Sequence, residues 1–204
     1  MMQPNNTNLG STIVKRAKFM HLCSAVIFFV AGLLLALVPD FDDSGFFRNA
    51  LVGIASIIIG ATGIYGYFSN DMYRLAFQQD FALGIFNVIF GILLIINPVQ
   101  LSVLLPTAVS VLTLLDGGNK SQMVLEGKNF GIQKWYLVLV SAILEIAAGL
   151  VLILLAYHEL DVRAWMGVAM GLVGIVNFWT TMYTVRVRKN THQILSVYTD
   201  AEKY

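Results

Sequence analysis

The sequence predicts an all-α membrane protein with six transmembrane helices arranged as three tandem helical hairpins. Of its 204 residues, 57% are hydrophobic and only 12% are charged, whereas soluble domains average about 25% charged residues. The apolar residues also fall into blocks of about twenty, long enough as helices to cross a hydrocarbon core of about 30 Å. A third observation, a repeat of small residues, groups these blocks into pairs.

The six apolar blocks form the predicted membrane domain, residues 19–185, between tails of residues 1–18 and 186–204. Helix is the expected conformation, because an open strand would leave backbone groups unpaired in lipid and no block alternates like a barrel strand. Pro106 in the short fourth block is expected either to begin its helix or to kink it. The predicted spans are residues 19–38, 47–68, 81–96, 101–115, 134–157 and 162–185.

The basic residues predict the orientation, because Lys and Arg concentrate in cytoplasmic segments. Eleven of the thirteen lie in the two tails and in the second and fourth connections. Lys120 and Lys128 are among them, in the predicted fourth connection. The first, third and fifth connections hold only Arg48 and Arg163. Both termini are therefore expected in the cytoplasm.

A pattern with small residues at its first and last positions recurs in the odd-numbered spans at offsets of 0, 3 and 7, which lie on one helix face. Its members are Ala25-Phe28-Gly32, Gly84-Asn87-Gly91 and Ala142-Glu145-Gly149. Each pattern ends in a glycine, and successive glycines are 59 and 58 residues apart: Gly32, Gly91 and Gly149. The matching positions in the even-numbered spans are Gly60 and Gly63, Thr113 and Asp116, and Gly171 and Gly174. Small residues on one face let helix backbones approach closely, so these glycines are expected at helix contacts.

Several runs resemble the HdeD family of bacterial acid-resistance membrane proteins. They are FFVAGLLLALVP and NVIFGILLIINP in the first and third spans, SAILEIAAGLVLI in the fifth and GLVGIVNF in the sixth. Each run is mostly glycine and aliphatic residues, so their order and spacing carry the resemblance, which extends over about residues 18–188. The resemblance implies a multi-pass protein of the bacterial cytoplasmic (inner) membrane that is associated with acid survival and has no established enzymatic activity.

Three polar residues inside the predicted spans are candidate site residues: Glu145, Asn87 and Asn177. An acidic residue at the centre of a span costs about 2.5 to 3.5 kcal/mol on insertion scales. Burial disfavours the charged form, so Glu145 is expected to be often protonated. It is either a proton relay or acid sensor, or a structural carboxylic acid hydrogen-bonded to Asn87 or Asn177. The two amides are expected to link helices by hydrogen bonds.

The remaining polar positions predict no chemistry of their own. Asp116 is expected in a turn with Gly117, Gly118 and Asn119, where it reaches interfacial water. The three histidines are far apart in the chain and in predicted depth, so no metal site is expected. No phosphate-binding loop, paired-histidine zinc motif or nucleophile elbow occurs. The sequence therefore predicts no catalytic residue, no cofactor and no enzyme.

Two main functions are compatible with these residues. The first is a non-enzymatic, HdeD-like protein that contributes to acid resistance. The alternative is a small channel or transporter that conducts protons or a small solute through a polar seam including Glu145. A structural role in a membrane complex is a third hypothesis. The expected surroundings are the lipid bilayer, with a second copy of the chain or another membrane complex as further partners. A net charge of +1 gives no bias toward nucleic acid.

Overall fold

The computed structural model describes residues 5–38, 45–69, 80–129, 135–158 and 162–185. All the secondary structure in this part of the chain is helical, which confirms the predicted all-α class. The helices are α1 (Asn5–Leu37), α2 (Phe46–Tyr67), α3 (Asp80–Ile96), α4 (Pro98–Leu101), α5 (Leu105–Asn129), α6 (Trp135–Tyr157) and α7 (Arg163–Thr184).

Four of these helices are long and apolar enough to cross a membrane: Thr12–Leu37 within α1, and the whole of α2, α6 and α7. Helix α3 is also apolar but has 17 residues. Helix α5 is different, because its second half carries charged residues, among them Asp116, Lys120 and Lys128. The described helices thus support a multi-pass membrane protein, with α3 and α5 as its less typical members.

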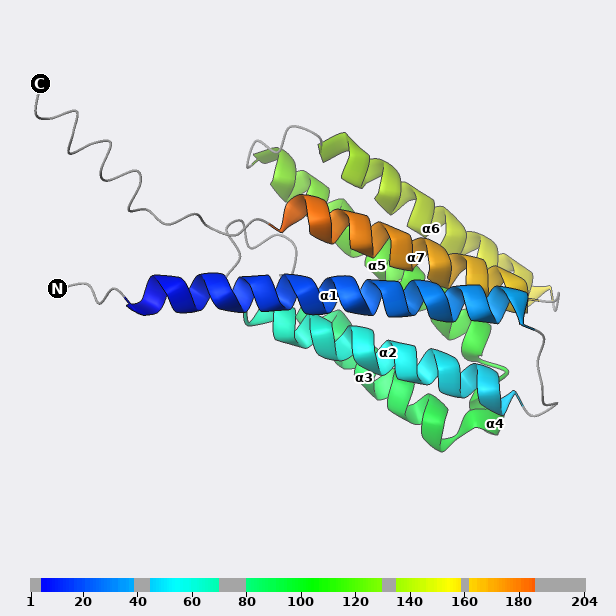
Figure 1. Ribbon diagram of the computed structural model, residues 1–204. Helices are drawn as coiled ribbons and strands as arrows, with labels where there is room; N and C mark the ends of the chain where they lie inside the picture. Colours follow the sequence, from blue (N-terminus) through cyan, green and yellow to red (C-terminus); the bar gives the residue numbers. More distant parts are fainter. Residues whose placement is uncertain (1–4, 39–44, 70–79, 130–134, 159–161, 186–204) are drawn as a thin grey trace, which may run out of the picture.

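Successive long helices run in opposite directions, so α1 starts at the end of the bundle where α7 finishes (Figure 1). We call this the terminal end and the opposite one the far end. A contact between the first and last helices fixes this arrangement: Lys18 Nζ donates hydrogen bonds to the carbonyl oxygens of Met182, at 3.3 Å, and Val185, at 3.1 Å. Six long helices, an even number, return the chain to the end where it began.

The closest helix packing is not within the predicted hairpins but between them. The three most extensive interfaces join α2 to α3, α5 to α6, and α7 to α1. Each therefore pairs the second helix of one hairpin with the first helix of the next, and the α7–α1 interface closes the series into a ring. Contacts within the hairpins are fewer, and they are fewest between α3 and α5.

The same spacing of small residues builds all three close interfaces. In α2, α5 and α7, the second helices of the three hairpins, two small residues lie seven positions apart. They meet the two small residues of the repeat on α3, α6 and α1, respectively. The pairs are Gly60 with Gly84 and Gly53 with Gly91, Gly117 with Ala142 and Ser110 with Gly149, and Gly174 with Ala25 and Gly167 with Gly32. A side chain at Gly60 or Gly32 would lie 2.5 Å from backbone atoms of the facing helix, so these positions need glycine.

These contacts correct the predicted register of α5 relative to α2 and α7, the other second helices of the hairpins. Gly117, rather than Thr113, meets Ala142 in the way that Gly60 meets Gly84. The position equivalent to Gly63 is then Lys120, and not Asp116. Gly171 contributes to the close approach in another way, since its own backbone lies against Gly32.

Helix α5 also differs from the predicted fourth span. Pro106 lies in its first turn, where a missing N–H costs little, so the proline begins the helix and does not kink it. The helix then continues to Asn129, past the predicted end at residue 115, and the predicted turn at Gly117, Gly118 and Asn119 is wrong. Two interior glycines cost about 2 kcal/mol of helix propensity, and the close contact of Gly117 with α6 offsets that cost.

The distribution of side chains is the inverse of that in a soluble protein. Large apolar residues lie exposed on the outside of the bundle, as Ile85, Phe86, Ile89 and Ile92 do on α3. Polar side chains are buried inside, including those of His21, Ser56, Asn87, Thr113, Lys120, Glu145, Asn177 and Thr181. An outer surface of this kind suits a lipid solvent. An apolar groove of about 320 Å³ lies on the outside between α3 and α5.

Toward the far end the interior is mostly apolar, with the Asn49 amide as a buried polar group bonded to the Pro98 carbonyl oxygen. Three leucines, each three residues after the glycine of its repeat, are buried in one cluster with one residue each from α2, α5 and α7. We call this set the apolar plug: Leu35, Leu94, Leu152, Val52, Val109 and Met166. Each of the three repeats supplies one leucine from its first helix and one apolar residue from its second helix. The plug therefore follows the pseudo-threefold arrangement of the helices.

Candidate functional site

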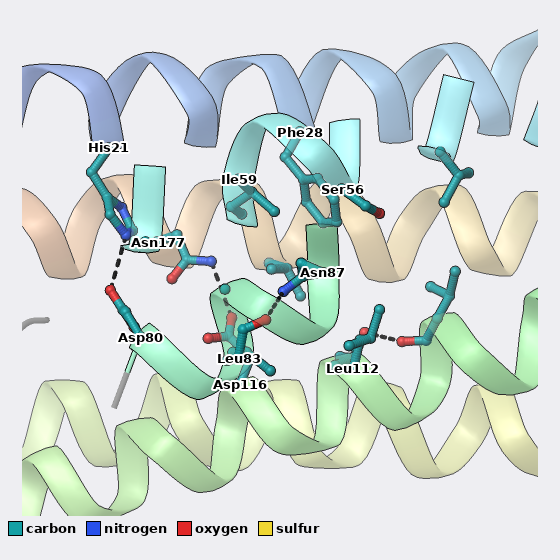
Figure 2. Close-up of a pocket in the computed structure, with 16 residues that line it drawn as sticks. His21, Phe28, Ser56, Ile59, Asp80, Leu83, Asn87, Leu112, Asp116 and Asn177 are labelled. Carbon is teal, nitrogen blue, oxygen red and sulfur yellow. Dashed lines mark hydrogen bonds and ion pairs between the residues drawn. The ribbon is translucent and has the colours of Figure 1, made fainter. Parts of the chain in front are cut away.

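Two adjoining cavities occupy the interior toward the terminal end, with volumes of about 50 and 40 Å³. Four polar residues line both of them: His21, Asp80, Asp116 and Asn177 (Figure 2). We call the two cavities together the vestibule. One extends inward to Asn87 and the other extends to Thr184, the last residue of α7. Both have polar side chains in an otherwise largely apolar lining and are large enough to hold water molecules.

A buried lysine on α5 connects two acidic residues beside the vestibule. Lys120 Nζ lies 2.6 Å from Asp116 Oδ2, one helical turn away, and 2.8 and 3.0 Å from the two carboxylate oxygens of Glu145 on α6. The side chain of Glu145 is fully buried, whereas that of Asp116 is 15% exposed. A buried pair of this kind is retained only when opposite charges and hydrogen bonds compensate for lost hydration. Lys120 supplies that compensation.

Helix α7 extends the same network. Asn177 Nδ2 donates a hydrogen bond of 3.0 Å to Asp116 Oδ2, the oxygen that also accepts from Lys120. Asp116 therefore links a cation on its own helix to an amide on α7. Figure 2 shows this amide and the carboxylate facing each other across the vestibule. Residues of α5, α6 and α7 are joined by these four side chains.

A second polar cluster joins α1, α3 and α7. His21 Nε2 lies 3.2 Å from Asp80 Oδ2, and His21 Nδ1 lies 3.3 Å from Thr181 Oγ1. Asp80 is the first residue of α3, where a carboxylate also interacts favourably with the helix dipole. Thr181 lies one turn after Asn177 on α7. The two clusters are thus neighbours along α7 as well as across the cavity.

The predicted site residues are brought to this region, but with partners that the sequence did not predict. Glu145 pairs with Lys120, and neither Asn87 nor Asn177 bonds to it. Asn87 Nδ2 instead donates to the carbonyl oxygen of Leu83, one turn earlier on α3. Asn177 is the only one of the two amides that links helices.

Two sequence assignments near the site need correction. Lys120 lies buried within α5 and not in a connection, because α5 continues beyond residue 115. Asp116 likewise lies on the helix, bonded to Lys120 and Asn177, and not in a turn. A signal was present in the sequence. Asp116 and Lys120 are four residues apart with opposite charge, which is the spacing of an ion pair on one helix face.

His21 and Asp80 were also missed as a pair. They are 59 residues apart, the repeat distance, so they occupy equivalent positions of the first two repeats. The third repeat has Val138 at that position. The middle position of the small-residue pattern varies in the same way, with Phe28, Asn87 and Glu145. The ring therefore presents different chemistry from positions that its backbone makes equivalent.

The vestibule ends at the apolar plug. Val52 and Val109, two plug residues, line the inner cavity together with Asn87 and Phe28. Beyond them the buried side chains of this cluster are aliphatic or methionine. The arrangement can hold water beside its carboxyl and imidazole groups. Within the residues that the structure describes, no cluster of His, Cys, Asp and Glu side chains forms a metal site.

A family model described as a short repeat of unknown function, DUF308, matches the chain twice, at residues 23–95 and 82–154. The two matches start 59 residues apart, which is the spacing of Gly32 and Gly91. Each covers one hairpin and the first helix of the next, so each includes one of the close interfaces. Neither a curated protein nor a solved structure matches the chain.

Proposed function

The chain belongs to the DUF308 family, the membrane protein family that includes HdeD, and we propose that it contributes to acid resistance in the bacterial inner membrane. In this proposal the protein is not an enzyme. It spans the membrane six times, through α1, α2, α3, α5, α6 and α7, with both termini in the cytoplasm. The vestibule then opens toward the cytoplasm and responds to protons that enter the cell.

The observation that carries this proposal is the charge held inside the bundle. Three carboxyl groups, those of Asp80, Asp116 and Glu145, face one lysine and one histidine. These come from α1, α3, α5 and α6, while the residues of α2 and α7 that line the vestibule carry no titratable group. With a neutral histidine and ionised carboxyls the net charge is −2. Acid adds protons to such groups and reverses this balance, and the bundle must repack around the new charge.

Conduction of protons or a solute is less well supported. A channel needs a polar path across the whole bundle, and the apolar plug closes the far half of the interior. Its six residues come from all three repeats, so opening a path would require the whole ring to rearrange. A polar vestibule that ends at an apolar cluster fits sensing or buffering better than transport.

The test is acid survival of a bacterium that lacks its own copy of the gene. Wild-type protein should restore survival after acid challenge. Asp116→Asn, which cannot take up a proton, should fail to do so at equal membrane abundance. Thr107→Val, a change on the outer groove, is the matched control and should restore survival fully. Deletion with no loss of survival under several acid regimes would count against the acid-resistance role.

The orientation has a separate test by cysteine labelling. In a Cys23→Ser background, Asp42→Cys and Asp161→Cys should react with a membrane-impermeant thiol reagent in intact cells, and Lys128→Cys should not. Residues 42 and 161 lie outside the described residues, and their placement rests on the distribution of basic residues. Labelling of Lys128→Cys in sealed cells would reverse the proposed orientation.

A further inference from the structure

The vestibule has amide oxygens that no protein group uses. Asn87 and Asn177 are 9% and 8% exposed, and both line the inner cavity. Their nitrogens donate to the Leu83 carbonyl and to the Asp116 carboxylate, which are groups that only accept. In both amides the nitrogen must therefore be the atom that faces this acceptor, and the oxygen points away from it. Neither oxygen has a hydrogen-bond partner within the described part of the chain.

The hydroxyl groups nearby do not supply donors to these oxygens. Thr113, Thr180 and Thr184 each donate to the backbone carbonyl four residues earlier on their own helix. Lys120, the buried cation at this level, already binds two carboxylates. These three hydroxyl groups and Lys120 therefore donate to other acceptors and not to the two amide oxygens.

The charge of the same region depends on whether its two carboxyl groups are ionised. When both are ionised, Lys120 neutralises one of them and one negative charge remains on the Asp116–Glu145 pair. An uncompensated charge in a membrane interior is expensive. A positive ion in the cavity would balance it, and unused amide and carboxylate oxygens are the ligands that hard cations prefer.

We propose that the vestibule binds one small monovalent cation, Na⁺ or K⁺, with several of its water molecules. The ligands are the Asn87 and Asn177 amide oxygens and the Asp116 carboxylate, which share the cavity of about 50 Å³. This volume admits a partly hydrated metal ion and is too small for choline. The inference rests on the proposed function in one respect, the access of water to the vestibule.

The test uses the full chain purified in detergent at pH 8, where carboxylates are most available. Thermal unfolding is followed in NaCl, KCl and choline chloride at equal ionic strength. A bound ion stabilises the folded state by mass action, so NaCl or KCl should raise Tm by several degrees in a saturable way relative to choline chloride. The same Tm in all three salts would overturn the proposal.

Variants separate a cation site from a general salt effect. Asn87→Leu removes one ligand and should lose most of the Tm response, while Thr107→Val on the outer groove should keep it. Asn177→Leu offers a second variant if Asn87→Leu does not fold. A full response in both asparagine variants would also refute the site. Acid survival is measured separately, so an absent salt response with intact rescue rejects only the cation, and a deletion without phenotype rejects only the acid-resistance role.

Discussion

The α2–α3 and α5–α6 interfaces share one packing geometry and differ in chemistry. In the first, Gly60 meets Gly84, and in the second, Gly117 meets Ala142 at the equivalent place. At the next equivalent positions, however, the first interface has Asn87 and Gly63, and the second has Glu145 and Lys120. The repeat therefore sets how the helices approach, and a few substitutions set what the interior can bind.

The two interfaces also differ in what stabilises them. The α2–α3 contact depends on close backbone approach, since a side chain at Gly60 would lie 2.5 Å from the Gly84 carbonyl oxygen. The α5–α6 contact is less tight at Gly117 but includes a fully buried carboxylate held by Lys120. Packing that needs no charge is available in the same protein. The ion pair is therefore better explained by a role in the vestibule than by a need for stability.

The largest expected effect comes from removing the cation of the α5–α6 interface. Lys120→Met leaves Glu145 buried without a counter-charge, and breaking one partner of a buried pair costs about 3 to 5 kcal/mol. The variant should show a much lower unfolding midpoint and lower yield in detergent.

A double variant distinguishes lost charge pairing from lost packing. Lys120→Met combined with Glu145→Leu removes both charges and should recover most of the stability. Lys128→Met is the control, because Lys128 is exposed and its Nζ lies over the Trp135 ring, 5.2 Å from the ring centroid. Its loss should cost about 1 kcal/mol or less. If Lys120→Met is as stable as wild type, the ion pair is absent in the protein.

A smaller effect is expected from testing the tight α2–α3 contact. Gly60→Ala places a methyl group against the Gly84 carbonyl oxygen and the Val88 backbone nitrogen, at 2.5 and 2.9 Å. Because backbone atoms cannot move aside locally, the cost should be about 1 to 3 kcal/mol of unfolding free energy. Thermal or denaturant unfolding in detergent measures it.

Two glycines of α5 calibrate that result. Gly117→Ala should cost less, because its nearest contact is the flexible Ile146 side chain, at 2.8 Å. Gly118 has nothing within 4 Å of an added methyl, so Gly118→Ala should be neutral or stabilise the helix by up to about 1 kcal/mol. A ranking in which Gly118→Ala is the most harmful would contradict the helix register of α5.

The sequence predicted most of the helices but not their order of packing. Blocks of apolar residues placed α2, α3, α6 and α7 within a few residues of their observed bounds. Consecutive helices were expected to pair as hairpins, since the repeat distance equals one hairpin. The same repeat is equally compatible with pairing across hairpins, and only the contacts of Gly53, Gly84 and their equivalents decide between these arrangements.

The candidate site was predicted in part, through its intramembrane polar residues. Glu145 and Asn177 were identified because polar groups are costly in lipid, and both belong to the network around Asp116. Lys120 was not identified, because Gly117, Gly118 and Asn119 have the local propensity of a turn. Tertiary contact with α6 outweighs that propensity, and a single sequence gives no measure of such a contact.

The change most decisive for function is Glu145→Gln, for which only a small loss of stability is expected. Glutamine keeps the size of the side chain and can accept one hydrogen bond from Lys120, which retains Asp116 at 2.6 Å as a charged partner. The ion pair becomes a hydrogen bond from a charged donor to a neutral acceptor, so the expected loss is about 1 kcal/mol. Since glutamine cannot bind a proton, acid survival at matched membrane abundance tests the proton-responsive role directly. Lost survival with a folded protein supports a carboxyl group that titrates. Full survival would limit Glu145 to pairing with Lys120, and the response to acid would then rest on Asp116, Asp80 and His21 in the vestibule.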